Sequence, residues 1–380
     1  MPSIPVLLSA GEASGDMYAA RLARALKQRA DVALFGMGGP RMREAGVDVV
    51  ANYSEVSVVG ITEIVRHLPS LVRTLRLLVA EADRRKPALA ILTDFPGFHL
   101  RLARKLKHRG IRNVCYICPQ FWAWRPWRAR LVRRRFAKAL CIFPFEQNFY
   151  GHAGAPVNFI GHPLVGAVHP SLNRKEFCER QQLDPAKHVV TVLPGSRTAE
   201  LKHHWPVLRE ACVEIHRKSG AQLVVALAPG CDVALVPTDR AAHLPLRVVV
   251  GQSYEALSAA DAAIVSSGTA TIEAALLDVP MVVVYRVTAL TALLVKPLLR
   301  TSFFSMVNLI ADRAVVTELI QKDFTCARVS SETLRLLLDE RARETQRAGL
   351  KEVRQRLGPP GAVERAADAI LHLMASGNSK

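Results

Sequence analysis

Residues 188–201 read HVVTVLPGSRTAEL, and this stretch indicates the class of the fold. An apolar run of strand length ends at Leu193, a Pro-Gly-Ser turn follows, and a helix is expected to start near Glu200. A strand without polar alternation is buried on both faces, which is typical of a parallel sheet covered by helices. Ligands of such sheets bind beyond the carboxyl ends of the strands, which is where this turn lies.

The same unit of strand, turn and helix recurs along the chain. Further apolar runs that end in turns lie at residues 4–10, 31–39, 87–97, 221–230, 261–269 and 279–286. The pattern restarts after a charged helical segment, so two α/β units meet near residues 165–187. We therefore predict an α/β protein of two Rossmann-like domains, residues 1–170 and 171–350, with an active-site cleft between them. A final helix within residues 351–380 is expected to pack back on the N-terminal domain.

The composition favours a folded protein with anionic partners. Of the 380 residues 50% are hydrophobic, and 51 Lys and Arg against 33 Asp and Glu give a net charge of +18. Such a charge favours an anionic membrane surface, phosphorylated substrates or nucleic acid. Aromatic residues make up only 6%, and no segment matches an RNA-stacking motif, so nucleic acid is not expected as a partner.

The seven cysteines indicate a reduced, cytoplasmic protein. They are odd in number and scattered through apolar stretches, unlike a disulfide framework. Cys115 and Cys118 form a CxxC inside an apparent strand, where a spacing of three places them on opposite faces. No second CxxC accompanies them, so we interpret them as core thiols rather than zinc ligands.

No segment is predicted to span a membrane. The N-terminal run lacks a basic region, and its apolar part is too short for a signal peptide. The nearest candidate for a span, residues 287–299, contains Lys296 and Pro297 and stays below the roughly 18 apolar residues that a span needs. Membrane attachment is therefore expected to be peripheral.

Two basic segments each leave two interpretations open. Residues 121–136, FWAWRPWRARLVRRRF, bring three tryptophans beside several arginines. They form either a solvated basic helix with an aromatic packing face or a surface for anionic headgroups. Residues 61–79 have apolar side chains at helical spacing with arginines between them. This helix either covers the sheet or faces a membrane or acyl chains.

The second half of the chain carries the pattern of a diphosphate site. Arg197 follows the Pro-Gly-Ser turn, and its five-donor guanidinium suits phosphate. In VSSGTATIEAAL, small residues between a strand and a helix leave backbone N–H groups available to phosphate oxygens. Glu273, one turn into that helix, can accept two ribose hydroxyls; the alternative is an ordinary, well-capped helix. The predicted donor-site residues are Ser196, Arg197, Ser267, Gly268, Thr269 and Glu273.

The first half carries the candidate base, Asp94. This residue ends an apolar strand before Pro96 and Gly97, where an acid does not belong to the core, so it is the best general-base candidate. A turn-stabilising role is the alternative. The loop GEASGD follows the first strand at the same expected sheet edge, although helix capping would also explain Asp16. The expected substrate-contact residues in this loop are Gly11, Glu12, Ser14, Gly15 and Asp16.

Several nucleotide and metal motifs are missing from the sequence. It contains no Walker A pattern, no GxGxxG, no D-x-D and no H-E-x-x-H. An ATPase, a dinucleotide oxidoreductase and a metal-dependent mechanism are therefore disfavoured, and we expect neither a cofactor nor a metal. The charge of a leaving diphosphate would then be neutralised by arginine and backbone dipoles.

Nine motifs in series resemble the bacterial lipid-A-disaccharide synthase family. In chain order they are GEASGD (11–16), TDFPGF (93–98), FWAWR (121–125), FPFE (143–146), FIGHPL (159–164), LPGSR (193–197), SSGTATIE (266–273), PMVVVYR (280–286) and SMVNLIA (305–311). Each motif alone is a weak signal, but the series spans nearly the whole chain. The family is therefore indicated by the order of the motifs.

The resemblance implies a GT-B fold and an inverting glycosyl transfer at the cytoplasmic face of the inner membrane. In this family UDP-diacylglucosamine donates its sugar to the 6-hydroxyl of diacylglucosamine 1-phosphate, which gives a β-1′,6 disaccharide and UDP. By motif match Asp94 falls on the family's proposed base. The matches at the nucleotide-diphosphate site are Arg197, Ser267, Thr269 and Glu273. Arg286 is implied as a further phosphate ligand, and Asn308 as another cleft-lining residue.

A few positions depart from the family pattern. His99 stands where Asn is usual, and the run 119–121, Val284 and Asp312 also differ. None of these changes removes a charged candidate, so we expect the activity to be retained. Two alternatives remain open at this point: another UDP-sugar transferase with a polyprenyl-linked acceptor, or a non-enzymatic basic protein that binds membranes.

Overall fold

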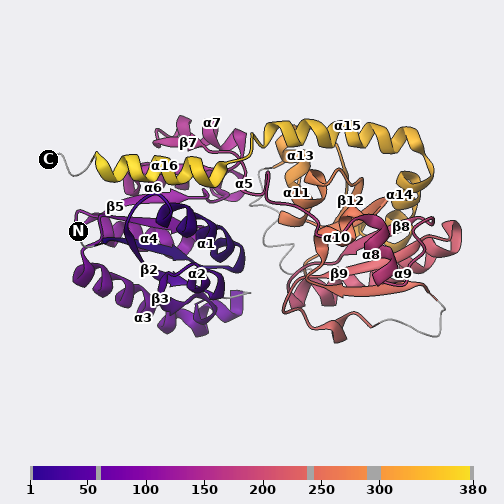
Figure 1. Ribbon diagram of the computed structural model, residues 1–380, viewed down its shortest axis with the longest axis horizontal. Helices are drawn as coiled ribbons and strands as arrows, with labels where there is room; N and C mark the ends of the chain where they lie inside the picture. The colour runs from indigo at the N-terminus through magenta and orange to yellow at the C-terminus, as the bar shows by residue number, and fades with distance from the viewer. Residues whose placement is uncertain (1–2, 57–60, 238–243, 289–300, 377–380) are drawn as a thin grey trace. The chain divides into compact units, whose positions relative to one another are not determined.

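The chain forms two compact α/β units. The computed structural model describes residues 3–56, 61–237, 244–288 and 301–376 (Figure 1). One unit consists of Met1–Pro163 with Gly358–Lys380, and the other of Leu164–Leu357. In the described residues each unit contains one sheet, and every strand pairing in it is parallel. These two sheets confirm the predicted α/β class.

The sheet of the first unit has the strand order β3-β2-β1-β4-β5-β6-β7. Its strands are β1 (Ile4–Ala10), β2 (Val32–Gly38), β3 (Asp48–Asn52), β4 (Leu89–Thr93), β5 (Arg112–Tyr116), β6 (Lys138–Cys141) and β7 (Val157–Phe159). From β1, the strands β2 and β3 follow toward one edge of the sheet. From β4, the strands β5, β6 and β7 follow toward the other edge. The sheet therefore changes direction between its central strands β1 and β4.

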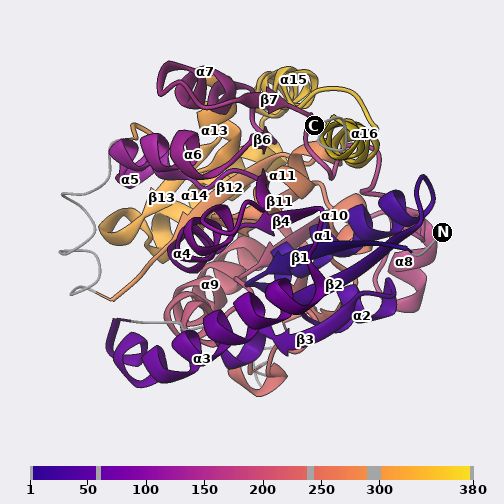
Figure 2. The ribbon, with the colours of Figure 1, turned by 90° about the vertical axis from the view of Figure 1, so that its left-hand side faces the viewer.

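Helices cover both faces of this sheet. They are α1 (Ala13–Lys27), α2 (Pro40–Glu44), α3 (Ile61–Arg85), α4 (Pro96–Lys107), α5 (Phe121–Trp124), α6 (Ala129–Arg135), α7 (Pro144–His152) and α16 (Ala362–Ala375). Leu7 and Leu92 belong to a core cluster with residues of α3 and α4. Because side chains alternate along a strand, the neighbouring Leu8 and Ile91 face the opposite side, which α1 covers. Figure 2 shows α3 beside β3 at the edge of the sheet.

The sheet of the second unit has the order β10-β9-β8-β11-β12-β13. Its strands are β8 (Val189–Leu193), β9 (Gln222–Leu227), β10 (Leu246–Val250), β11 (Ala262–Ser266), β12 (Met281–Tyr285) and β13 (Thr317–Ile320). Its helices are α8 (Arg174–Arg180), α9 (Thr198–Ser219), α10 (Ser253–Ser258), α11 (Thr269–Leu276), α13 (Met306–Ala311), α14 (Cys326–Leu338) and α15 (Glu340–Arg356). Its core joins α9 and α14 to fully buried valines and leucines of the central strands. The change of direction lies between β8 and β11.

The last helix, α16, belongs to the first unit. It packs on α1, and Arg29 of the segment after α1 forms an ion pair of 3.3 Å with Asp368. Arg365 donates from Nε to the carbonyl of Ile160 at 2.9 Å. These contacts, which span most of the sequence, hold the C-terminal segment against the N-terminal sheet.

Two local predictions were wrong. Residues 121–136 are not one helix but α5, a 3-10 turn (Pro126–Arg128) and α6, because Pro126 cannot continue α5. Cys115 and Cys118 do not lie on opposite faces of one strand. The strand β5 ends at Tyr116 and Ile117 turns with φ 63°, so both buried thiols join the same core cluster. They are core thiols, as expected.

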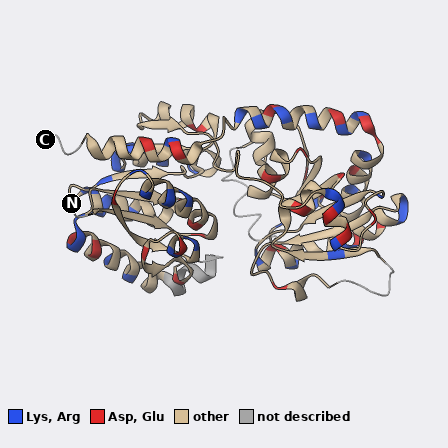
Figure 3. Ribbon diagram, viewed as in Figure 1, with Lys and Arg blue, Asp and Glu red and all other residues tan. Residues whose placement is uncertain are grey.

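Charge is distributed over both units. Lys and Arg occur on helices throughout the described chain, with acidic residues interspersed along α15 (Figure 3). In the described residues no helix is long and apolar enough to cross a membrane. Most of the apolar stretch at residues 287–299 lies outside the part of the chain that the structure describes.

Candidate active site

Most of the predicted site residues lie at the two points where the strand order changes direction. In the first unit, the loop after β1 and the loop after β4 follow neighbouring strands of the sheet. In the second unit, the loops after β8 and β11 do the same. In open parallel sheets the ligand crevice lies at such a point, beyond the carboxyl ends of the strands. Each unit thus brings its own candidates together.

Asp94 occupies a strained turn between β4 and α4. Asp94 and Phe95 have φ angles of 53° and 50°, the left-handed region that costs a residue with a Cβ about 1–2 kcal/mol. The Asp94 carboxylate accepts from the Phe95 N–H at 2.8 Å through Oδ1. The side chain is half-buried. Strained turns of this kind gather at functional sites because the surrounding structure must hold them in place.

His99 connects this turn to the first strand. Its Nδ1 lies 2.6 Å from the Asp94 carbonyl oxygen, and its Nε2 lies 2.8 Å from the Ser9 hydroxyl of β1. Both Ser9 and His99 are buried. Burial lowers the pKa of His99 to about 4, although the hydrogen bond to Asp94 acts in the opposite direction. The imidazole is therefore neutral at physiological pH.

The loop GEASGD contacts the Asp94 turn through its glycines. A Cβ on Gly11 would lie 2.2 Å from the Phe95 ring, so this close approach requires glycine. A Cβ on Gly15 would lie 3.9 Å from the Asp94 Cβ. Glu12 is the N-cap residue of α1 and Ser14 lies in its first turn, and both are half-buried. The two loops thus form one packed unit at the sheet edge.

Asp16 has a structural role in this unit. Its carboxylate is 2% exposed and accepts three backbone N–H groups, those of Gly39 at 2.7 Å, Arg41 at 3.1 Å and Met42 at 3.2 Å. These groups belong to the start of α2, whose N-terminus Asp16 therefore caps. This carboxylate binds the start of α2, and substrate contact by Asp16 stays a prediction. The capped helix is not the following helix α1 but α2, whose start is more than 20 residues further along the chain.

Glu146, at the start of α7, is a buried acid to which the sequence analysis assigned no role. Its side chain accepts from Trp122 Nε1 at 3.1 Å and from the Ile142 and Phe143 N–H groups at 3.3 Å each. Burial raises the pKa of Glu146 to about 8, and the charge of Asp94 acts in the same direction. The sequence signal was FPFE itself, because Pro at the first helical position and Glu at the third mark a helix start.

In the second unit, Glu200 shapes the turn that presents Arg197. Its Oε2 accepts from the Ser196 N–H at 3.0 Å and the Arg197 N–H at 3.3 Å, which makes a capping box at the start of α9. Gly195 has φ 129° and packs against Glu200. The Arg197 side chain is 53% exposed and lies 3.7 Å from Glu200 Oε1. An exposed guanidinium on an ordered turn is suited to meet an anionic ligand.

The start of α11 is the second half of this site. Gly268 is the N-cap residue, with φ 149°, and both Gly268 and Thr269 are exposed. The Ser267 hydroxyl donates to the Phe304 carbonyl at 3.1 Å. Glu273, one turn into the helix, accepts from the Tyr254 hydroxyl at 3.1 Å. An open glycine at a helix N-terminus allows an anion to approach the backbone N–H groups.

Two other candidates, Arg286 and Asn308, make structural contacts. Arg286 donates through Nη2 to the carbonyls of Gln321 and Phe324 and stacks over the Phe324 ring at 5.0 Å. Asn308 is 1% exposed, and its amide makes four hydrogen bonds. The partners are the N–H groups of Val315 and Val316, the carbonyl of Val316 and the carboxylate of Glu318. The Asn308 amide has no capacity left for a ligand, so it orders the loop instead.

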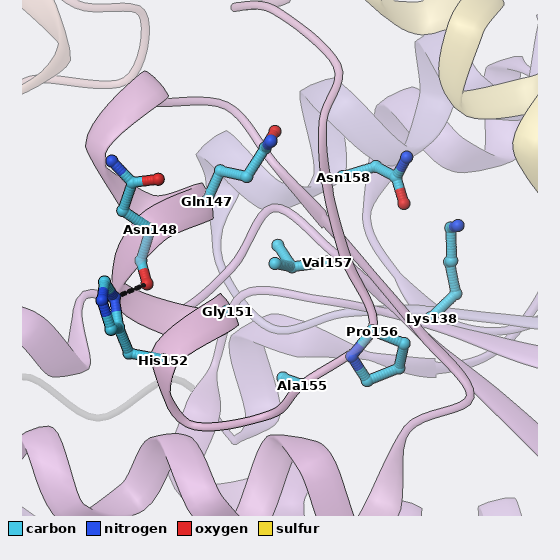
Figure 4. A pocket seen from close by; sticks show the side chains of 9 residues that line it. All are labelled: Lys138, Gln147, Asn148, Gly151, His152, Ala155, Pro156, Val157 and Asn158. Atoms are coloured by element: carbon cyan, nitrogen blue, oxygen red, sulfur yellow. Dashed lines mark hydrogen bonds between the residues drawn. The ribbon is translucent and has the colours of Figure 1, made fainter.

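A pocket of about 530 Å³ at the start of β6 and β7 lies apart from these residues (Figure 4). Lys138 and Val157 begin these two strands, and His152, which contacts the Asn148 carbonyl at 2.6 Å, ends α7. The pocket is thus at the amino ends of the strands. Asp94 lies at a carboxyl end, so this pocket does not belong to the candidate site.

The sequence profile described as lipid-A-disaccharide synthetase matches residues 6–371. The chain belongs to the lipid-A-disaccharide synthase family. The lipid-A-disaccharide synthase of Solibacter usitatus is 44% identical over 376 residues, with 98% of each chain covered. That of Myxococcus xanthus is 41% identical over 376 residues, again with 98% of each chain covered. As a member of this family the chain is a glycosyltransferase of lipid A biosynthesis.

Solved structures confirm the GT-B fold expected of a lipid-A-disaccharide synthase. The glycotransferase of kitacinnamycin matches with a TM-score of 0.67 at 18% identity and covers 98% of this chain and 100% of that one. MurG of Acinetobacter baumannii matches with a TM-score of 0.58 at 15% identity, with 98% and 100% covered. At these identities the similarity concerns the fold alone.

Proposed function

We propose that Asp94 is the general base of the family's reaction, in which diacylglucosamine passes from UDP to the 6-hydroxyl of diacylglucosamine 1-phosphate. The observation that carries this assignment is the half-buried carboxylate at the end of β4, held on a strained turn beside the change in strand order. A base at this position takes the proton of the 6-hydroxyl as its oxygen attacks the anomeric carbon. One displacement of this kind inverts the configuration from α to β.

The leaving UDP is bound by the second unit in this proposal. Arg197 and the N–H groups at the start of α11, next to Gly268 and Thr269, neutralise the charge that develops on the diphosphate. Glu273 accepts the ribose hydroxyls. The exposure of Arg197 and Gly268 supports this assignment, because both groups are accessible to a ligand.

The test is the formation of the β-1′,6 disaccharide from the two purified lipid substrates. We expect UDP and disaccharide to appear in equal amounts, and the new linkage to be β. An α linkage, or transfer only to a polyprenyl-linked acceptor, would contradict the proposal. The first outcome would remove the single-displacement mechanism, and the second would change the acceptor.

We further propose that the protein associates peripherally with the cytoplasmic face of the inner membrane through α3. The last part of α3 covers the sheet, since Leu78, Val79 and Ala82 are core residues. Further toward its start, Leu68 and Val72 are 56% and 39% exposed. They line a groove of about 590 Å³ together with Pro69, Arg73 and Arg76. Exposed aliphatic groups beside arginines suit the boundary between acyl chains and anionic headgroups.

Vesicle binding tests this surface. The double variant Leu68→Asp with Val72→Asp is expected to lose most of its binding to vesicles that contain anionic phospholipid, because it places charge among the acyl chains. The matched control is Leu338→Asp, which changes a leucine that is 64% exposed in the other unit. Equal binding by the double variant and the wild type would contradict the proposal.

A further inference from the structure

The backbone of the Asp94 turn needs support from outside itself. Asp94 and Phe95 are consecutive residues with positive φ, and neither is glycine. An L residue with a Cβ avoids this region, so the turn persists only where neighbouring groups determine it. The direction of the Asp94 carboxylate follows from this backbone. Whatever holds the turn therefore also aims the side chain.

His99 is placed to provide that support. The first turn of α4 returns to Phe95, whose carbonyl accepts the N–H groups of Phe98 at 3.2 Å and His99 at 3.0 Å. The His99 ring then reaches the preceding carbonyl, that of Asp94, at 2.6 Å from Nδ1. Its other nitrogen meets Ser9, which lies on the adjacent strand and pairs with Leu92 in the sheet. The ring thus connects β1, the turn and α4.

The chemistry of the two partners determines the state of the ring. A carbonyl oxygen can only accept, so Nδ1 must carry the proton. His99 is 3% exposed with the rings of Phe95 at 6.1 Å and Phe98 at 5.7 Å, surroundings that favour a neutral imidazole. Nε2 is then an acceptor, and the Ser9 hydroxyl donates to it. Each hydrogen-bonding group of the ring has one complementary partner.

We propose that His99, as a neutral Nδ1–H imidazole held by Ser9, is the positioning residue that fixes the backbone of Asp94 and so aims its carboxylate. This inference rests on the proposed role of Asp94 as the base. His99 touches no substrate in this assignment and acts through Asp94. Where the family pattern has Asn, a side-chain amide offers the same kind of N–H donor to the carbonyl.

Kinetics of variants test the role in turnover. His99→Leu fills the buried position with an apolar side chain and removes both hydrogen bonds, and we expect kcat to fall roughly tenfold or more with KM changed by less than about threefold. His99→Asn is expected to recover kcat to within about threefold of wild type, and Ser9→Ala to lose about two- to fivefold. The matched control is His216→Asn, because His216 Nδ1 also contacts a backbone carbonyl, that of Ala221 at 2.9 Å, but in the other unit. The control should have the same kcat and KM as the wild type.

A double variant separates positioning from an independent role. Because His99 acts through Asp94, adding His99→Leu to Asp94→Ala should cause no further loss of kcat. The proposal would be overturned if the two single losses of kcat multiplied in the double variant. A kcat of His99→Asn no higher than that of His99→Leu would also overturn it.

Nitrogen NMR of the full-length protein tests the ring without any activity measurement. With labelled histidine, the His99 signals, identified by their loss in His99→Asn, should show a protonated Nδ1 and a bare Nε2 near pH 7. Ser9→Ala should shift the Nε2 signal. An Nε2–H or doubly protonated ring would overturn the proposal. If instead the protein proved inactive in disaccharide synthesis while the ring showed the expected state, the assignment of Asp94 would fail and not the geometry of His99.

Discussion

In both sheets, candidate residues lie where the strand order changes direction. The two sites differ in how far their polar groups are exposed. In the first unit, four polar side chains are buried and hydrogen-bonded: Ser9, Asp16, His99 and Glu146 are all below 4% exposed. In the second unit, Arg197, Gly268 and Thr269 are exposed, and Glu200 accepts the Ser196 N–H in the turn that carries Arg197. Asp94 itself is half-buried, so the candidate groups of the second site are the more exposed ones.

This difference suits two different tasks. A group that takes a proton in the transition state must be held in one orientation before the substrate arrives. A site that binds a highly charged, hydrated diphosphate gains more from accessible donors that the ligand itself orders. The comparison therefore favours the proposed roles, which are catalysis for the first unit and donor binding for the second. Variants test these roles, because a change at Asp94 should lower turnover and a change at Arg197 should weaken donor binding.

The largest effect is expected from Asp94→Ala. Loss of a general base should lower kcat by roughly 10²–10⁴-fold, while the affinity for the UDP-sugar changes little because the base acts mainly in the transition state. Turnover and donor binding are measured separately, by product formation and by calorimetry. Asp83→Ala, an acid on the solvent side of α3 with 52% exposure, is the control. Wild-type turnover in Asp94→Ala would remove the chemical role of the first unit.

The next effect concerns stability and pH in the buried site. The folded pKa of Glu146, about 8, lies above the ordinary value of 4.5, so the folded protein holds this proton more tightly than the unfolded chain. The contribution of this proton to the free energy of unfolding is complete below about pH 4.5. It decreases as the pH rises through the folded pKa of about 8, by about 3–5 kcal/mol in total. Glu146→Gln, which cannot ionise, should flatten this part of the pH dependence.

Urea unfolding between pH 6 and pH 9 measures the effect of Glu146. The exposed acid Glu44 of α2 provides the control, since Glu44→Gln changes charge in the same unit without burial. If Glu146→Gln lost stability with pH as steeply as the wild type, the carboxyl would not titrate as described.

A smaller effect is expected from Arg197→Ala in the open site. It should weaken the binding of UDP and lower kcat/KM by roughly 10–100-fold, because a charge-assisted contact to phosphate is lost. The melting temperature should stay within about 1–2 °C, because a half-exposed ion pair contributes little to stability. Arg217→Ala, on the far part of α9, is the matched control. Marked unfolding without loss of UDP affinity would contradict the assignment of Arg197 to the donor site.

The smallest effect compares two glycines near Asp94. Gly11→Ala brings a Cβ within 2.2 Å of the Phe95 ring and should destabilise the fold by about 1–3 kcal/mol. Gly97→Ala in α4 meets nothing within 4 Å and should be neutral or stabilise by up to about 1 kcal/mol. Thermal unfolding distinguishes them. Equal melting temperatures would show that the loop after β1 moves to accommodate the added methyl group.

Much of the fold and part of the site follow from the sequence. Buried strands, turns and helices were predicted from apolar runs and from local residues such as Pro194 and Gly195, and these patterns need only near neighbours. Asp94 was placed at a strand end for the same reason. Two interpretations were open for the helix of residues 61–79. Leu78 and Val79 are core residues that cover the sheet, whereas Leu68 and Val72 are exposed, and contact with a membrane stays a proposal.

The tertiary structure alone decided which of the candidate polar groups remain accessible. Asp16 and Asn308 were predicted to contact ligands, yet both side chains are buried and meet backbone groups that lie 7 to 26 residues away along the chain. Glu146 and His99 gain their altered pKa values from burial that no local pattern reveals. The sequence by itself determined which chemical groups stand at the strand ends. Folding determined their partners, because hydrogen bonds and desolvation depend on distance in space rather than along the chain.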